Sequence, residues 1–301
     1  MTLAPIALFA YNRPRHLARV ADALARNPEA DRSRLVVYSD AAKSAASAED
    51  VAAVRAVAKG VKSFLSVEVV EQTENKGIAQ SIIDGVGDLV SRFGRVIVLE
   101  DDLLPSQHFL RFMNGALDLY EGDERVASVH GYSYPVPERL PETFFLRGAD
   151  CWGWATWKRA WALFEPDGKR LLEEIEARVL ADRFDLDGSY PYTEMLRDQI
   201  AGRNDSWAIR WHASAFLEDR LTLYPASSQI QNIGADGSGS HVGHTRAFEH
   251  RDWGRPVDLQ RIPVEESAEA LRAFARFLAG LRVSPVSRLL ARLSSLRTAF
   301  R

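Results

Sequence analysis

The first hundred residues alternate between short apolar runs and stretches with helical spacing, and this alternation leaves few possible folds. The apolar runs are PIALFAYN, SRLVVYSD, SVEVVEQT and RVIVLEDD. The stretches between them carry apolar residues three and four positions apart, as amphipathic helices do. Strands rich in Val, Ile and Leu that alternate with helices form a mainly parallel sheet covered on both faces. The sequence therefore predicts an α/β fold with a mainly parallel sheet flanked by helices.

Polar residues stand where three of these runs end. They are Tyr11-Asn12-Arg13, Ser39-Asp40 and Glu100-Asp101-Asp102. In an open parallel sheet the carboxyl ends of the strands meet along one edge, where ligands bind. Three adjacent carboxylates repel one another unless a positive charge shares the site. The cluster is therefore either a solvated strand end before a helix, whose first turn favours acids, or a metal site for a phosphorylated ligand.

Glycine-rich phosphate loops are missing after the first apolar run, which argues against a dinucleotide enzyme and a P-loop NTPase. A phosphate bound without such a loop requires cations. Carboxylates at a strand end suit Mg²⁺ or Mn²⁺, which prefer oxygen ligands and bridge to phosphates.

The stretch CWGWATWKRAWALF holds four of the seven tryptophans of the chain. Trp154, Trp157 and Trp161 have the i, i+3, i+7 spacing of a helix that faces the core. Indole rings also stack on sugars, so Trp152-Gly153-Trp154 is open to either interpretation. Further on, Asn204 and Asp205 are expected to cap a helix. The later stretch NIGADGSGSH is either a plain loop or a mobile lid.

Composition restricts the class of protein further. The net charge of −3 argues against a general nucleic-acid binder. The single cysteine, Cys151, excludes an internal disulfide and fits a reducing compartment. The N-terminal stretch is a poor signal peptide, and no run reaches the roughly 18 apolar residues that span a bilayer. The sequence predicts a cytoplasmic protein.

Four stretches, in their order along the chain, resemble motifs of the GT-A fold glycosyltransferases. They are FAYNRPRHL, VLEDD, CWGWATWKRAW and DSWAIRW…LYP…NIGADGSGSH. The similarity is to bacterial family-2-like sugar transferases and to N-acetylglucosaminyltransferase I, which shares the Glu-Asp-Asp form of the acidic motif. It implies a catalytic domain over residues 1–250, with a nucleotide-binding half (1–103) and an acceptor-binding half (104–250). Residues 251–301 would then form a C-terminal amphipathic helical extension.

The resemblance assigns roles by position. It implies donor-binding residues at Tyr11, Asn12, Arg13, Asp40, Lys76, Glu100 and Asp101. It implies acceptor-binding residues at Trp152, Gly153 and Trp154. Asp102 would bind Mn²⁺ or Mg²⁺, with Asp101 and His241 as further candidate ligands. Asp205 would be the catalytic base, although Asn204 replaces the first acid of the family motif, so Glu194 and Asp198 are fallback bases.

The predicted activity is metal-dependent, inverting transfer of a sugar from a nucleotide-diphosphate sugar to a glycan hydroxyl. A UDP-sugar donor and a role in bacterial surface polysaccharide synthesis are expected from the resemblance alone. Two alternatives stay open, namely a nucleotidyltransferase that makes nucleotide sugars and an inactive carbohydrate-binding protein with the same fold.

The end of the chain has a pattern of its own. No acid follows Glu269, whereas seven arginines do, among leucines and phenylalanines with helical spacing. A basic amphipathic helix can bind the interface of an anionic membrane. This predicts peripheral contact with the inner face of the cytoplasmic membrane and a lipid-linked acceptor. The alternative is a helix that packs on the catalytic domain or forms a homodimer contact.

Overall fold

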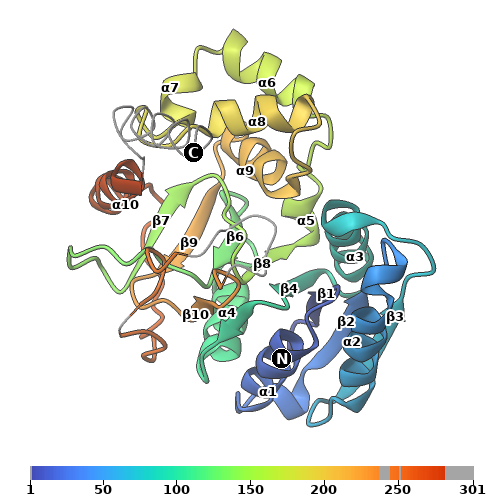
Figure 1. Ribbon diagram of the computed structural model, residues 1–301. Helices are drawn as coiled ribbons and strands as arrows, with labels where there is room; N and C mark the ends of the chain where they lie inside the picture. Colours follow the sequence, from blue (N-terminus) through green and yellow to red (C-terminus); the bar gives the residue numbers. More distant parts are fainter. Residues whose placement is uncertain (1, 237–244, 251, 282–301) are drawn as a thin grey trace, which may run out of the picture.

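The computed structural model describes residues 2–236, 245–250 and 252–281 (Figure 1). An eight-stranded mixed sheet runs through the molecule in the order β3-β2-β1-β4-β8-β6-β9-β7. Its strands are β1 (Ile6–Ala10), β2 (Arg34–Ser39), β3 (Ser66–Glu71), β4 (Arg95–Glu100), β6 (Val126–His130), β7 (Thr143–Arg147), β8 (Trp154–Trp157) and β9 (Leu221–Pro225). Neighbouring strands from β3 to β4 are all parallel, and so are β6 and β9, while β8 and β7 run antiparallel to their neighbours. The predicted α/β class with a mainly parallel sheet is confirmed.

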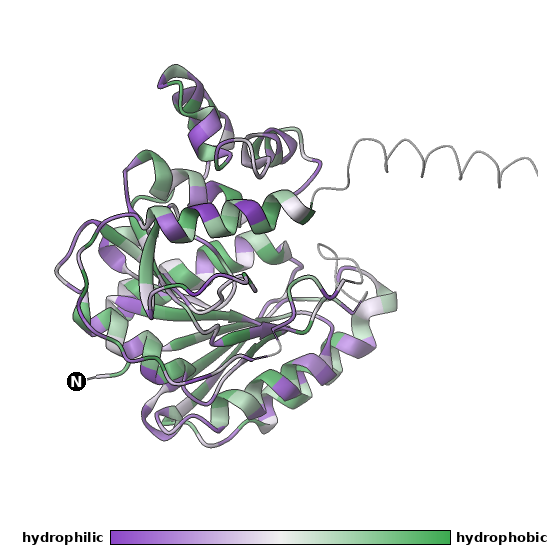
Figure 2. Ribbon diagram, turned by 90° about the vertical axis from the view of Figure 1, so that its left-hand side faces the viewer, coloured by the Kyte–Doolittle hydropathy of each residue, from purple (hydrophilic) through white to green (hydrophobic). Residues whose placement is uncertain are grey.

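Helices cover both faces of this sheet. One face carries α1 (Pro14–Ala25), α2 (Ala48–Gly60) and α4 (Phe109–Leu119), and the other carries α3 (Gly77–Phe93), α5 (Lys158–Trp161) and α9 (Trp207–Leu217). Successive residues of a strand point to opposite faces, so Ile6 and Leu8 of β1 pack in the first layer and Ala7 and Phe9 in the second. Figure 2 shows the hydrophobic strands between helices whose outer surfaces carry most of the hydrophilic residues.

Helix α3 lies unusually close to the sheet. A Cβ atom at Gly85 would lie 2.8 Å from ring carbons of Phe9 and 3.0 Å from the Tyr38 ring. Gly94 ends the helix in a left-handed conformation (φ 79°), which glycine adopts without steric strain. The close approach packs the middle of α3 against Phe9 of β1 and Tyr38 of β2.

The remaining elements lie outside the eight-stranded sheet. Two 3₁₀ turns span Ala30–Arg32 and Ala45–Ser47, and the short strands β5 (Leu103–Pro105) and β10 (Ile230–Asn232) pair with each other. The helices α6 (Gly168–Ala177), α7 (Ala181–Phe184) and α8 (Tyr192–Ile200) lie beside α9. The last helix is α10 (Ala268–Leu281). Ala270 and Phe274 of α10 pack on Phe144 of β7 and Tyr224 of β9. Residues 282–301, with most of the predicted membrane-binding pattern, lie outside the described residues. In the part of the chain that the structure describes, no helix is long and apolar enough to cross a bilayer.

Two local predictions are wrong. Trp154 and Trp157 belong to strand β8 rather than to a helix, and only the short α5 follows. Because β8 is buried on both faces, its pattern of apolar residues does not distinguish a strand from a helix. The cap of α9 is Ser206, whose Oγ accepts a hydrogen bond from the backbone N–H of Ile209 at 3.2 Å. Asp205 is therefore not needed as a cap.

Candidate active site

A cavity of about 900 Å³ opens at the carboxyl ends of β1, β2 and β4. The parallel register places Ala10 beside Ser39 and Phe9 beside Glu100, so the polar residues after these three strands lie at one edge of the sheet, as predicted. The cavity wall divides into two parts. The donor half contains Tyr11, Asn12, Arg13, Asp40, Lys43, Asn75, Glu100, Asp101 and Asp102. The aromatic half contains Tyr132, Tyr134, Asp150, Trp152, Tyr190, Tyr192 and Phe248.

The three acids of the donor half share a positive charge that the protein itself supplies. The guanidinium of Arg13, at the end of β1, contacts the carboxylate of Asp101 and lies 3.0 Å from Oδ2 of Asp102. Burial lowers the pKa of Arg13, but the charges of Asp101 and Asp102 outweigh burial and raise it. Burial raises the pKa of Asp101 to about 6 in spite of Arg13. Burial, followed by the charges of Asp102 and Asp101, raises the pKa of Glu100 to about 8.

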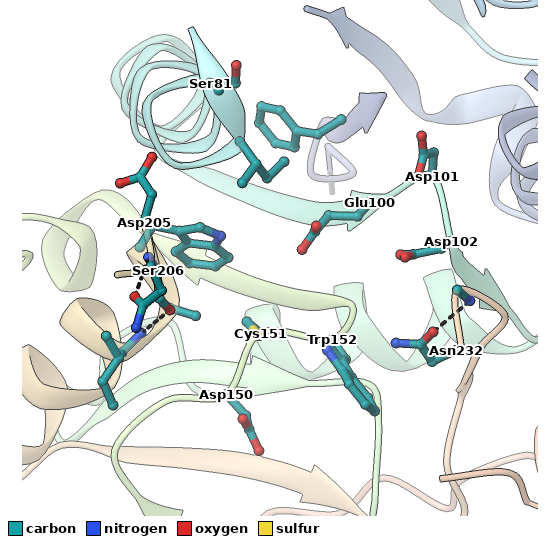
Figure 3. Close-up of a pocket in the computed structure, with 18 of the residues that line it drawn as sticks. Ser81, Glu100, Asp101, Asp102, Asp150, Cys151, Trp152, Asp205, Ser206 and Asn232 are labelled. Carbon is teal, nitrogen blue, oxygen red and sulfur yellow. Dashed lines mark hydrogen bonds between the residues drawn. The ribbon is translucent and has the colours of Figure 1, made fainter. Parts of the chain in front are cut away.

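The donor half fits a metal ion only in part. Within the described ranges, no group of three His, Cys, Asp or Glu side chains could hold a metal. The Asp102 carboxylate points into the cavity (Figure 3). Among the described residues, Arg13 forms an ion pair with Oδ2 of Asp102, and no ion pair is made by Oδ1. Proteins commonly bind Mg²⁺ through one or two carboxylates, with substrate phosphates and water completing the shell. The site therefore suits an ion that arrives with a diphosphate. The candidate ligand His241 lies outside the described residues.

Asp40 has a different environment from the one expected. Its Oδ1 accepts hydrogen bonds from the backbone N–H groups of Ala41 and Lys76, at 2.8 and 2.9 Å. Its Oδ2 accepts from Asn75 Nδ2 at 3.0 Å and from the N–H of Gly77 at 2.9 Å. The carboxylate thus accepts four hydrogen bonds from the protein, and it has no lone pair left for the predicted contact with the donor. Asp40 instead holds the start of α3, and Asn75 is the side chain that this turn presents at the cavity wall.

Two lysines lie near the donor half, and the one that lines the cavity is Lys43 rather than the predicted Lys76. Lys76, predicted to bind the donor, has its Nζ 2.7 Å from Asp84 on α3 and does not line the cavity. Lys43 does line it. The Tyr11 hydroxyl holds this loop, because it donates to Ser47 Oγ and accepts from the backbone N–H of Lys43, both at 3.0 Å. Sequence reasoning missed Lys43, since a loop lysine carries no recognisable pattern.

Of the three predicted acceptor-binding residues, only Trp152 reaches the cavity. Its indole packs edge-on against Tyr132, with ring centroids 4.8 Å apart. Trp154 has no exposed surface and packs against Trp207 in the core, so its predicted contact with a sugar is wrong. Gly153 has φ 66°, and a Cβ there would lie 2.6 Å from the side chain of Ile230. Gly153 therefore allows close packing rather than acceptor binding.

Asp205 lies across the cavity from the acidic cluster (Figure 3). Its side chain is 68% exposed, and Arg210 of α9 lies 3.7 Å from Oδ1. The fallback bases are elsewhere. Glu194 is exposed on α8, Asp198 pairs with Arg203, and neither lines the cavity. Asp205 is thus the one of the three candidate bases that the fold brings to the site.

The aromatic half contains residues that sequence reasoning missed. Asp150 follows β7 and lies at the cavity wall, with the hydroxyls of Tyr134 and Tyr224 each 3.4 Å from its Oδ2. Two histidines of the wall, His130 and His212, are buried, and burial lowers their pKa values to about 3 and about 4. Both are therefore neutral at pH 7. These residues come from β6, β9, α9 and intervening loops, so no local pattern connects them.

No protein-family model and no curated protein matches this sequence. Among solved structures, residues 1–349 of TarS from S. aureus match with 8% identity and a TM-score of 0.42, over 77% of this chain and 61% of that one. Glucosyl-3-phosphoglycerate synthase from Mycobacterium tuberculosis, crystallised with Mn²⁺, UDP-glucose and phosphoglyceric acid, matches with 12% identity and a TM-score of 0.33, over 54% of this chain and 58% of that one. A 4-diphosphocytidyl-2C-methyl-D-erythritol synthase matches with 13% identity and a TM-score of 0.28, over 46% and 65%.

This chain spans less than two thirds of the length of each of these three proteins. With TM-scores below 0.5, these matches identify neither a family nor an activity.

Proposed function

We propose that this protein is a glycosyltransferase that moves a sugar from a nucleoside-diphosphate sugar to a hydroxyl group of a glycan. One observation carries the proposal. A single cavity joins an acidic strand-end cluster, which suits a metal-bound diphosphate, to an aromatic half that contains Trp152, with the carboxylate of Asp205 on the opposite wall. Aromatic side chains beside polar groups are the usual lining for a sugar. The Glu-Asp-Asp motif adds the resemblance to N-acetylglucosaminyltransferase I.

The donor half would hold the nucleotide diphosphate. Asp102 would bind Mn²⁺ or Mg²⁺ together with the diphosphate oxygens, and such an ion neutralises the charge that develops on a departing diphosphate. Arg13 reduces the repulsion between the acidic cluster and an anionic donor, because its guanidinium offsets part of the negative charge of Asp101 and Asp102. Lys43 adds a second cation to this half. UDP is the nucleotide we favour, from the resemblance of the motifs.

Asp205 would act as the base. A carboxylate can accept the proton of the acceptor hydroxyl as that oxygen attacks the sugar. Inversion requires the base and the leaving group on opposite sides of the sugar, and Asp205 faces the acidic cluster across the cavity (Figure 3). Its exposed side chain can turn toward an acceptor.

Binding of UDP in the presence of Mn²⁺ tests the proposal directly. A ligand that binds the native state raises its melting temperature, so UDP with Mn²⁺ is expected to raise Tm more than UDP alone. Asp102→Asn should lose the Mn²⁺-dependent increment, because its amide is a poor metal ligand, yet keep the unliganded Tm. Asp31→Asn, on the exposed 3₁₀ turn Ala30–Arg32 and outside the cavity wall, is the matched control. An unchanged increment in Asp102→Asn would contradict the metal role.

Activity assays separate the alternatives. Hydrolysis or transfer of the sugar from a UDP-sugar supports a glycosyltransferase. Pyrophosphate release from a nucleoside triphosphate and a sugar 1-phosphate would support a nucleotidyltransferase, and neither reaction is expected of an inactive carbohydrate-binding protein.

We also propose that the C-terminal residues bind an anionic membrane surface and bring the protein to a lipid-linked acceptor in surface polysaccharide synthesis. The support is the sequence, with seven arginines and no acid after Glu269. A chain that ends at Leu281 should keep UDP binding but lose sedimentation with anionic liposomes at low salt. If the full chain does not sediment with them, these residues instead pack on the catalytic domain or form a dimer contact.

A further inference from the structure

Asp150 is a carboxylate that the proposed transfer reaction does not use. It lies between β7 and β8 at the wall of the aromatic half, and Figure 3 shows it well away from Glu100, Asp101 and Asp102, below Cys151 and Trp152. The side chain is half-buried among aromatic rings. A carboxylate in such surroundings needs a partner, since removing a charge from water without one is costly.

The protein supplies only neutral partners for this charge, and they include the backbone N–H of Cys151. The Tyr134 and Tyr224 hydroxyls donate to Oδ2 at 3.4 Å, beyond the usual range for O–H···O hydrogen bonds. In the part of the chain that the structure describes, no Lys, Arg or His forms an ion pair with Asp150. Asp101 and Asp102, in contrast, share Arg13. The carboxylate of Asp150 therefore has unused capacity for a cation.

The surrounding wall adds no positive charge. Of the described residues that line the cavity, Arg13 and Lys43 are the only Arg or Lys, and both belong to the donor half. The titratable groups that face Asp150 are the side chains of Cys151, Tyr132, Tyr134, Tyr190, Tyr192 and Tyr224. Burial raises the pKa of each, so all are neutral at pH 7. The aromatic half thus carries net negative charge.

We propose that Asp150 binds a protonated amino group of the acceptor, so that this half of the cavity selects an amine-bearing sugar and rejects a phosphorylated or carboxylated one. An ammonium group supplies the missing ion-pair partner, and neighbouring aromatic rings favour a desolvated cation. An anionic acceptor would meet Asp150 with no cation beside it, which disfavours binding. The inference rests on the proposed function in one respect, which is that the aromatic half of the cavity binds the acceptor.

Binding of two sugars that differ in charge tests the inference. Glucosamine and N-acetylglucosamine share a ring, but only the first is a cation at pH 7. We would measure both affinities by saturation-transfer NMR with UDP and Mn²⁺ present, which keeps the donor half occupied. The full-length protein should bind glucosamine at least about tenfold more tightly, roughly the effect of 1.4 kcal/mol. Glucose 6-phosphate should bind more weakly than either.

Variants distinguish a charge effect from a structural one. Asp150→Asn keeps the shape and can still accept from Tyr134 and Tyr224, so it should fold and bind UDP but lose the preference for glucosamine. Tyr224→Phe removes one hydroxyl and leaves the charge, so it should keep the preference. Asp31→Asn, on the surface, should behave as the unmodified protein does.

The outcomes separate this inference from the proposed function. Equal affinity for the two sugars in the unmodified protein, or an unchanged preference in Asp150→Asn, would overturn the role of Asp150 even if UDP binds. A preference that depends on Asp150 supports the inference even if UDP does not bind, in which case the proposed function fails alone.

Discussion

Replacing Asp150 with asparagine should stabilise the protein at neutral and alkaline pH, which is unusual for a change in a cavity wall. Burial raises the pKa of Asp150 from its ordinary value of 3.8 to about 6. The folded protein therefore binds this proton more tightly than the unfolded chain does. The stability that the proton contributes is fully present below pH 3.8 and is lost as the pH rises through about 6. Asparagine has no charge to bury and avoids this loss.

The magnitude follows from the shift. Each pKa unit corresponds to about 1.36 kcal/mol, so a rise from 3.8 to about 6 corresponds to about 3 kcal/mol. Because Asp150 is partly open to the cavity, solvent reduces this value, and we expect about 1–3 kcal/mol at pH 8. The hydroxyls of Tyr134 and Tyr224 can donate to the amide oxygen as they do to the carboxylate, so hydrogen bonding changes little.

Urea unfolding at pH 8 and pH 3.8 measures the effect. The free energy of unfolding of Asp150→Asn should exceed that of the unmodified protein at pH 8, and the gap should shrink toward zero at pH 3.8. Asp31→Asn, whose carboxylate is 78% exposed, should differ by less than about 0.5 kcal/mol at both values. A gap of the same size at both pH values, or a destabilised variant at pH 8, would refute the idea that Asp150 is a charge buried without a strong partner.

Two further predictions concern the base and the packing of α3. Asp205→Asn should reduce sugar transfer by about two to four orders of magnitude and leave the Tm shift with UDP and Mn²⁺ unchanged, because a base acts on the acceptor and not on the donor. Full transfer activity in this variant would mean that the base lies elsewhere. Gly85→Ala should lower the free energy of unfolding by about 1–3 kcal/mol, since the new methyl group meets the Phe9 ring at 2.8 Å. Gly60→Ala, where no atom lies within 4 Å of the added carbon, is the control, and equal losses in the two variants would exclude a packing effect.

The class of fold was predictable from the sequence, because the periodicity of apolar residues in strands and helices is local. Strands that alternate with helices also pair in parallel as a rule. Four apolar runs separated by helical stretches imply a parallel sheet, and the carboxyl ends of such strands share one edge. For this reason the sequence alone places Arg13, Glu100, Asp101 and Asp102 in one site. The sequence placed Asp205 at the start of a helix but not at the cavity, since its position there depends on how α9 packs against α3.

The partner of each side chain depended on the tertiary structure. The sequence required a positive charge among the acids, but only the fold shows that Arg13 supplies it. Trp152 and Trp154 are two residues apart with similar chemistry, yet one lines the cavity and the other lies in the core, because β8 is buried on both faces. Asp150 meets Tyr224 across 74 residues of chain, through the pairing of β7 with β9. Such contacts leave no local pattern, since they arise only when distant strands become neighbours.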